Sequence, residues 1–200
     1  WSLSDAGLPG EYLLSIAIDP LVTTNLYVGA KDGVFKSVNG GNSWSLITTK
    51  LEGAMVFGIQ AFANATNTKS ILFAETNNKG LYRSLDNGAS WYVVFPGYSG
   101  AVISSLAKIP GDIDNLYGAT NFGFIKSTDN GSTWTSSNTG LLARLIFSMA
   151  INPDSPETIY AGVMGGNMKS DDCGETWSTH VTSPSNKTNA IAINPINSNM

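Results

Sequence analysis

The sequence has very few of the side chains that build disulfides and metal sites. Cys173 is the only cysteine and His180 the only histidine among the 200 residues. A disulfide within the chain needs two cysteines, and a structural zinc ion needs about four nitrogen or sulfur ligands. Composition therefore excludes both, and we expect no metal and no cofactor.

Charged residues are also scarce. They make up 13% of the chain, with a formal net charge of −4, and the lysines and arginines are spread along it rather than clustered. Nucleic-acid binding relies on clustered positive charge that releases phosphate counterions, so the sequence argues against a nucleic-acid partner. No apolar run reaches the roughly 18 residues of a membrane-spanning helix, so we expect no membrane span.

Most of the polarity comes instead from Asn, Ser, Thr and Gly. This mixture suits short strands joined by many turns. It also suits an extracellular, periplasmic or cell-surface environment, which is the location that we expect. No secretion signal is visible, and we attribute this to an N-terminus that is truncated relative to the complete protein.

One eight-residue motif occurs four times, and it reads Ser-x-Asp-x-Gly-x-(Ser/Thr)-Trp, with Asn39 replacing Asp in the first copy. Its tryptophans recur at spacings of 47, 43 and 43 residues. Each repeat also contains four short apolar or β-branched runs separated by turn residues, a pattern typical of strands. Four strands in about 43 residues is the size of one propeller blade. A β-sandwich is the structural alternative, but it gives no reason for so regular a repeat.

The residue types of the motif are those of a tight turn between two strands. Ser and Asp side chains can bond to backbone N–H groups a few residues on, and glycine can adopt a positive φ. The tryptophan then opens the next strand and can bury its ring between blades. We therefore interpret the motif as structural rather than as a row of catalytic acids. Its defining residues are Ser37, Asn39, Gly41, Trp44, Ser84, Asp86, Gly88, Trp91, Ser127, Asp129, Gly131, Trp134, Ser170, Asp172, Gly174 and Trp177.

This eight-residue motif is similar to the Asp-box, and with four copies of it the chain resembles the Asp-box (BNR) β-propellers. Each copy is called a box below. That superfamily includes sialidases, family-74 xyloglucanases, sortilin-type receptor domains and photosystem II assembly factor propellers. The resemblance covers essentially the whole chain. It implies a propeller fold, with boxes that are structural and lie away from the ligand site, but it implies no single activity.

The repeat is out of phase at both ends. Trp1-Ser-Leu resembles Trp44-Ser-Leu, the start of a fourth strand, yet no box precedes it. The segment 190–195 resembles 15–20, a first strand and its turn, yet no second strand follows. We therefore expect residues 1–200 to form one partial, all-β propeller. It would be an arc of four full four-stranded blades with an orphan strand at each end, and the full-length chain would supply the remaining blades.

Strand direction alternates within a blade, so the boxes share one face with the loops between first and second strands. Propeller ligands usually bind on the opposite face, which is what the resemblance implies here. Carboxylates with exposed aromatic rings suit a carbohydrate, because a ring stacks on a sugar and paired carboxylates can act as acid and base. The candidates on that face are Asp5, Glu11, Asp32, Glu52, Glu75, Tyr98, Phe122 and Arg144.

We favour a non-catalytic binding or scaffold module for a glycan or a protein, since a fold does not fix a function. A sialidase clamps its substrate with three arginines, and only Arg83 and Arg144 are present, the first at a repeated position. A fragment of a secreted glycoside hydrolase, of the xyloglucanase or sialidase-like type, stays open as the alternative. No motif assigns a catalytic residue.

Overall fold

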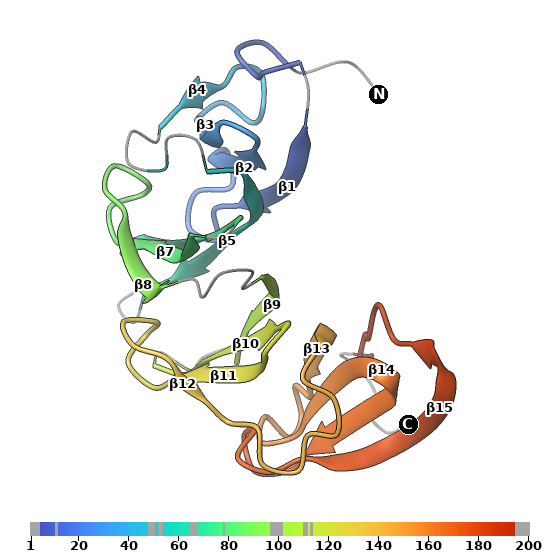
Figure 1. Ribbon diagram of the computed structural model, residues 1–200. Helices are drawn as coiled ribbons and strands as arrows, with labels where there is room; N and C mark the ends of the chain where they lie inside the picture. Colours follow the sequence, from blue (N-terminus) through green and yellow to red (C-terminus); the bar gives the residue numbers. More distant parts are fainter. Residues whose placement is uncertain are drawn as a thin grey trace. The chain divides into compact units, whose positions relative to one another are not determined.

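The computed structural model describes residues 5–10, 12–47, 51, 54–64, 68–77, 79–96, 102–109, 112 and 114–194. The chain divides into two compact units, Trp1–Val102 and Ile103–Met200, and each unit contains two antiparallel sheets (Figure 1). Within these described ranges, no helix is long and apolar enough to cross a membrane.

The first unit consists of two four-stranded sheets whose strands follow one another in sequence. The first sheet is formed by β1 (Leu13–Ile18), β2 (Leu26–Ala30), β3 (Gly33–Ser37) and β4 (Ser45–Leu46). The second is formed by β5 (Val56–Ala63), β6 (Ser70–Thr76), β7 (Gly80–Ser84) and β8 (Tyr92–Pro96). β6 is buried along its whole length, and its central residues 71–74 form a continuous apolar run.

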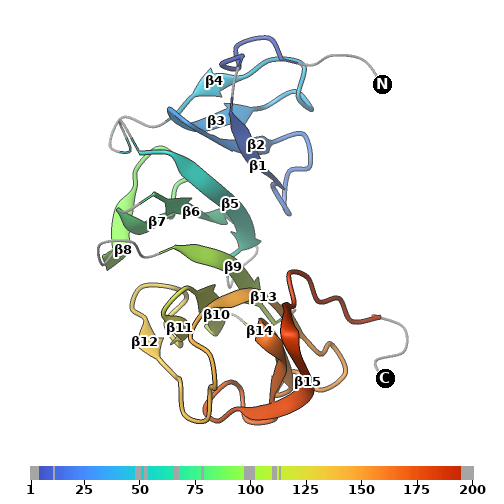
Figure 2. The same cartoon turned by 45° about the vertical axis from the view of Figure 1, so that its right-hand side comes forward.

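The second unit repeats this plan. One sheet contains β9 (Ile103–Lys108), β10 (Leu116–Thr120), β11 (Gly123–Ser127) and β12 (Thr135–Ser136), and the other contains β13 (Ile146–Ile151), β14 (Ile159–Ser170) and β15 (Ser178–Lys187). In each unit the first strands of the two sheets lie side by side, β1 beside β5 and β9 beside β13 (Figures 1 and 2).

The last sheet has three strands because β14 covers the positions of two. Its first half pairs with β13 and its second half with β15. Between the halves, Gly165 and Gly166 have φ values of 93° and 136°, and the latter is close to the 131° of Gly33 at the β2–β3 hairpin. β14 is therefore a hairpin that runs through its turn without a break, and the predicted all-β arc of four-stranded blades is confirmed.

A backbone hydrogen bond joins the box turn to the loop between first and second strands in three of the sheets. The N–H groups of Gly40, Asn130 and Cys173, each the fourth residue of its box, donate to the carbonyls of Thr24, Asp114 and Glu157 at 2.8–2.9 Å. All three donors have a positive φ of 57–68°. The boxes and these loops therefore lie at the same edge of their sheets.

The core of the first unit lies between its two sheets. Tyr27 and Val34 of the first sheet pack against Val56 and Ile59 of the second, and Trp91 of the second box completes the cluster. All five are at most 4% exposed. A ring of this size, buried between sheets, supplies much of the apolar area that holds them together.

The second unit has the equivalent core. Tyr117 and Phe124 pack against Ile146 and Met149, and the ring of Trp177 lies 4.9 Å from that of Phe124 in an edge-on arrangement. The indole N–H of Trp177 donates to the backbone carbonyl of Gly174 at 3.1 Å, which fixes the ring against its own box.

The two predicted orphan strands have different outcomes. Trp1-Ser-Leu lies outside the described residues. Residues 188–194 are not part of a strand. The first strands β1, β5, β9 and β13 each pair with the second strand of their own sheet, and among the described residues no such partner adjoins 190–194.

Candidate functional site

Each Asp-box turn is a closed hydrogen-bond network, and the third box is representative. The Ser127 hydroxyl donates to the Asp129 carboxylate and accepts from the Gly131 N–H, both at 2.8 Å. The carboxylate of Asp129 also accepts from the N–H and the hydroxyl of Thr133, at 2.8 and 2.7 Å. Both carboxylate oxygens of Asp129 therefore accept hydrogen bonds within the turn.

The first box replaces the carboxylate with an amide and keeps the network. Asn39 Oδ1 accepts from the Ser37 hydroxyl at 2.9 Å and from the Ser43 N–H at 3.0 Å. The Asn39 amide donates to the Ser43 hydroxyl at 2.9 Å, which reverses the direction of that bond relative to an Asp box. The amide of Asn39 makes the hydrogen bonds that the turn needs, so the turn does not require a negative charge.

The box carboxylates are held in the ionised form. Burial alone raises their pKa, but hydrogen bonds from hydroxyl and N–H donors outweigh it, so the pKa values of Asp86, Asp129 and Asp172 lie below the ordinary value. An acid that is already ionised and whose oxygens are occupied is poorly suited to donate a proton to a substrate.

Asp19 forms a second polar centre at the same edge of the sheets. It is 2% exposed, and its Oδ1 accepts from the Ser70 hydroxyl at 2.5 Å and from the Leu21 N–H at 2.9 Å. Its Oδ2 accepts from the Tyr27 hydroxyl at 3.3 Å. Burial raises the pKa of Asp19, but the bonds from Ser70, Leu21 and the N–H of Val22 outweigh it and leave that pKa lowered. The Ser70 bond links the two sheets of the first unit.

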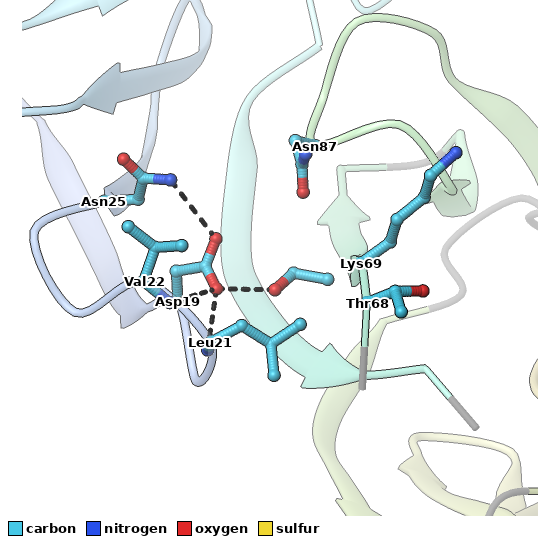
Figure 3. A pocket seen from close by; sticks show the side chains of 8 residues that line it. Asp19, Leu21, Val22, Asn25, Thr68, Lys69 and Asn87 are labelled. Atoms are coloured by element: carbon cyan, nitrogen blue, oxygen red, sulfur yellow. Dashed lines mark hydrogen bonds between the residues drawn. The ribbon is translucent and has the colours of Figure 1, made fainter. Parts of the chain in front are cut away.

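A small cavity of about 60 Å³ adjoins Asp19, as Figure 3 shows. It is lined by Asp19, Leu21, Val22, Asn25, Thr68, Lys69, Ser70 and Asn87. The Asp19 oxygens point to donors of the protein itself, so they are not free for a cation. A wider depression of about 440 Å³ adjoins the second box and is lined by Lys36, Ile47, Asp86, Asn87, Gly88 and Ala89.

The sequence-predicted candidates are distributed unevenly on the opposite edge. Asp5, Asp32, Phe122 and Arg144 are exposed, whereas Glu75, expected at an exposed loop, is buried within β6. Among the described residues, no hydrogen bond or ion pair joins any two of these five. The remaining candidates, Glu11, Glu52 and Tyr98, lie outside the described residues.

Tyr12 is the most unusual residue of that edge. Its φ is 59°, its ring is 59% exposed, and its carbonyl accepts the Lys31 N–H at 3.3 Å. The Lys31 ammonium lies 5.8 Å from the centre of the tyrosine ring. A left-handed backbone is rare for a bulky side chain and is found where the surrounding structure imposes it. It places Tyr12 beside the β2–β3 hairpin that contains Asp32.

Phe122 occupies the tip of the corresponding hairpin in the third sheet. Asp32 and Phe122 each precede a glycine of high positive φ, Gly33 at 131° and Gly123 at 121°. The Phe122 N–H donates to the Thr120 hydroxyl at 3.0 Å, and the ring is 47% exposed. An aromatic ring at an exposed hairpin tip is available for stacking on a ligand.

Glu75 breaks the repeat in a way that involves two strands. In the other three sheets, a serine of the first strand faces a residue with little or no side chain in the second: Ser15 faces Gly29, Ser105 faces Ala119 and Ser148 faces Gly162. In the second sheet this order is inverted, since Gly58 faces Glu75. A Cβ atom on Gly58 would lie 2.0 Å from a carboxylate oxygen of Glu75, so the glycine makes room for the glutamate.

The buried Glu75 carboxyl has a raised pKa. Burial raises it from 4.5 to about 7, against a weak hydrogen bond from the Gln60 amide at 3.4 Å that lowers it. Neither Gly58 nor Gln60 belongs to a motif that marked it as a candidate in the sequence. The signal for Gly58 was available in the repeat, where glycine stands in the place of Ser15 and Ser148.

The described residues contain no group of three or more His, Cys, Asp or Glu side chains arranged to hold a metal ion. The polar groups of the box edge bond mainly to one another. The opposite edge of the first sheet presents Tyr12, Lys31 and Asp32 to solvent, and the corresponding edge of the third sheet presents Phe122.

No protein-family model matches the sequence. No curated protein matches it significantly either. Solved structures do resemble it. The extracellular domain of the putative one-component system BT4673 from B. thetaiotaomicron has a TM-score of 0.71 at 13% identity, over 96% of this chain and 26% of that one.

Two further solved structures also resemble the chain. An ancestral GH74 enzyme has a TM-score of 0.68 at 23% identity, over 88% of this chain and 24% of the enzyme. YCF48 from Cyanidioschyzon merolae has a TM-score of 0.60 at 12% identity, over 91% of this chain and 60% of that one. The chain thus spans between about a quarter and three fifths of the length of these proteins. All three are β-propellers, and this chain has their fold.

Proposed function

We propose that this chain is part of a non-catalytic propeller module that binds a glycan or a protein at the edge opposite the Asp-boxes. The observation that supports the proposal most directly is Tyr12, an exposed aromatic ring on a constrained left-handed backbone, with Lys31 beside it. Rigid, exposed aromatic side chains give large contact areas at a low entropic cost. The box edge supports the same assignment by contrast, because its carboxylates are used within the turns.

The chemistry of Tyr12, Lys31 and Asp32 fits a carbohydrate or a polar peptide. The Tyr12 ring offers a face for stacking, and Asp32 offers acceptors for hydroxyl or amide donors. Lys31 supplies donors for hydroxyl, carbonyl or carboxylate groups. In the second unit, taken by itself, the Phe122 ring is exposed at the corresponding hairpin of the third sheet.

Binding of the full-length protein to an array of glycans and to extracellular peptides tests the proposal. For the ligand found, Tyr12→Ala is expected to cost about 1 kcal/mol or more, roughly a fivefold rise in Kd by calorimetry. Tyr92→Ala is the matched control, because Tyr92 is equally exposed at 58% but follows directly on the second box. Equal loss of affinity in both variants, or none in Tyr12→Ala, contradicts the proposed edge.

A glycoside hydrolase is a second candidate, and Glu75 is the observation that favours it. A carboxyl group whose pKa lies near 7 is in the state that a general acid needs. The ancestral GH74 enzyme is among the proteins with this fold, although the chain covers only 24% of it. Hydrolysis of a panel of plant β-glucans by the full-length protein tests this candidate. Turnover that Glu75→Gln abolishes favours the enzyme, and binding without turnover favours the module.

We also propose that residues 1–200 form one partial propeller that further blades complete, and that the protein is extracellular or periplasmic. The second point is supported by the BT4673 neighbour, which is an extracellular domain. Fractionation of cells that express the full-length protein tests the location.

A further inference from the structure

β1 exposes an apolar row that no other first strand exposes to this degree. Leu13, Ile16 and Ile18 are 48%, 63% and 59% exposed. Three large aliphatic side chains on one strand form a contiguous patch of the kind that marks an interaction surface. The row belongs to the face of the first sheet that points away from β5.

In the equivalent rows of two other sheets, the first two side chains are buried and the third is half-buried. In β5 the row is Val56, Ile59 and Ala61, and in β13 it is Ile146, Met149 and Ile151. The three strands share the same pairing and the same irregularity, between Leu13 and Ser15, Val56 and Gly58, and Ile146 and Ser148. Val56 and Ile59 are at most 3% exposed, because the first sheet covers them.

The covering surface has a constant chemistry. The first sheet presents Tyr27 and Val34 to the row of β5, and the third sheet presents Tyr117 and Phe124 to the row of β13. In both cases a tyrosine of the second strand and a large apolar residue directly after the hairpin glycine fill the interface. A partner for β1 therefore needs this pair of side chains on a twisted antiparallel sheet.

Residues 5–8 show what kind of partner this is. The Trp177 N–H donates to the Thr139 carbonyl at 2.9 Å, and Gly140 has a φ of 84°. Residues 138–141 follow β12, so this segment leaves one sheet and contacts the box tryptophan of the next. The same contact precedes the first sheet, where the Trp44 N–H donates to the Ala6 carbonyl at 2.8 Å and Gly7 has a φ of 90°.

The match between the two segments extends to their packing. A Cβ atom on Gly7 would lie 2.1 Å from the Trp44 carbonyl oxygen, and one on Gly140 would lie 2.2 Å from that of Trp177. Leu8 and Trp44 pack against one apolar cluster of the first sheet, and Leu141 packs against the cluster that contains Trp177. Residues 5–8 therefore have the conformation and contacts of a segment that leaves a preceding Asp-box sheet.

We propose that the row Leu13, Ile16 and Ile18 is the docking surface for another Asp-box sheet of the same protein, whose exit segment is residues 5–8. The inference rests on the proposed partial propeller and is independent of the proposed ligand. A second copy of this chain is a poorer occupant. The residue after the hairpin glycine of its last sheet is Asn167, a polar amide at the position of Val34 and Phe124.

Thiol labelling of the 200-residue chain tests this docking surface. Cys173→Asn removes the native thiol and places at this left-handed position the residue found at Asn87 and Asn130. In this background, the labelling rate of the thiol introduced by Ile16→Cys measures how exposed the row is. A missing sheet is supplied by a copy of residues 102–133 placed directly before Trp1, because Trp1-Ser-Leu-Ser aligns with the sequence that follows residue 133.

The added sheet is expected to slow labelling of the Ile16→Cys thiol by about tenfold or more, the factor that about 1.4 kcal/mol of docking free energy gives. Val181→Cys, on the exposed side of β15, is the matched control and should label at an unchanged rate. A second extension, copying residues 12–43, offers Tyr27 and Val34 in place of Tyr117 and Phe124.

Three outcomes overturn the proposal. One is an unchanged labelling rate at position 16 with both extensions, whether or not circular dichroism shows added strand. Another is equal protection of positions 16 and 181. The third is a chain without extension that is already protected at position 16 and dimeric by light scattering, which would assign the surface to a second copy. Ligand binding is read separately, so failure here leaves the proposed ligand edge untouched.

Discussion

Replacement of Glu75 by glutamine is expected to change how the stability of the protein depends on pH. The carboxyl titrates at about 7 in the folded protein and near 4.5 when free of burial. Below about pH 4.5 both the folded and the unfolded chain bind the proton, and its contribution to stability is fully present. As the pH rises from about 4.5 through about 7, the unfolded chain ionises first, so the contribution is progressively lost.

The size of this loss follows from the two pKa values. Their difference corresponds to about 3 kcal/mol, a substantial part of the free energy of unfolding of an ordinary domain. Glutamine cannot ionise, and its similar shape preserves the packing against Gly58 and the contact with Gln60. The free energy of unfolding of the Glu75→Gln variant should therefore rise relative to that of the parent protein between pH 5 and 8. The difference should level off above about pH 8.

Urea unfolding followed by tryptophan fluorescence measures this difference, because all other titrating groups are shared by the two proteins and cancel. Asp32→Asn, a substitution of the same kind at an exposed position, is the control background in which the difference made by Glu75→Gln should recur. A difference in stability between parent and Glu75→Gln that is flat from pH 5 to 8 would contradict the raised pKa of Glu75. Glu75 would then reach solvent or a cation in the folded protein.

Three further predictions concern the boxes and the sheet interfaces. Asp129→Ala should destabilise by about 1–3 kcal/mol in urea unfolding, because it leaves turn donors without an acceptor, whereas Asp129→Asn should be much milder, since Asn39 maintains the same turn. Trp177→Ala should cost about 3–5 kcal/mol by the same assay, as it empties the space beside Phe124. Gly140→Ala should lower the melting temperature, with a cost above about 1 kcal/mol, because its φ is 84° and its Cβ would meet the Trp177 carbonyl oxygen.

The repeat made the fold predictable. Each repeat of the sequence contains four short apolar or β-branched runs, and the strands were found as predicted. Each fourth strand begins directly after its box tryptophan. Local chemistry decides such features: a serine, an acid or amide and a glycine specify a turn whatever surrounds them. β14 differs only because its hairpin continues as strand through Gly165 and Gly166.

The candidate site was less predictable, because its properties depend on contacts across strands. Assigning Glu75 to a face by its place near a loop did not reveal that it is buried, since that depends on Gly58, a residue 17 positions earlier. The bond from Ser70 to Asp19 is equally invisible in the sequence, as it joins two sheets. The constrained backbone of Tyr12 has no local signal at all, because neither glycine nor asparagine marks the position.

The close approach of Gly58 and Glu75 also makes these two positions depend on each other. A Cβ atom at position 58 would lie 2.0 Å from a Glu75 carboxylate oxygen, so the glutamate side chain would have to leave its present place to admit it. A serine at position 58, like Ser15 and Ser148 in the sibling sheets, therefore needs another side-chain conformation or a smaller residue at position 75. The stability effects of substitutions at positions 58 and 75 should accordingly be non-additive, because the two side chains share one space.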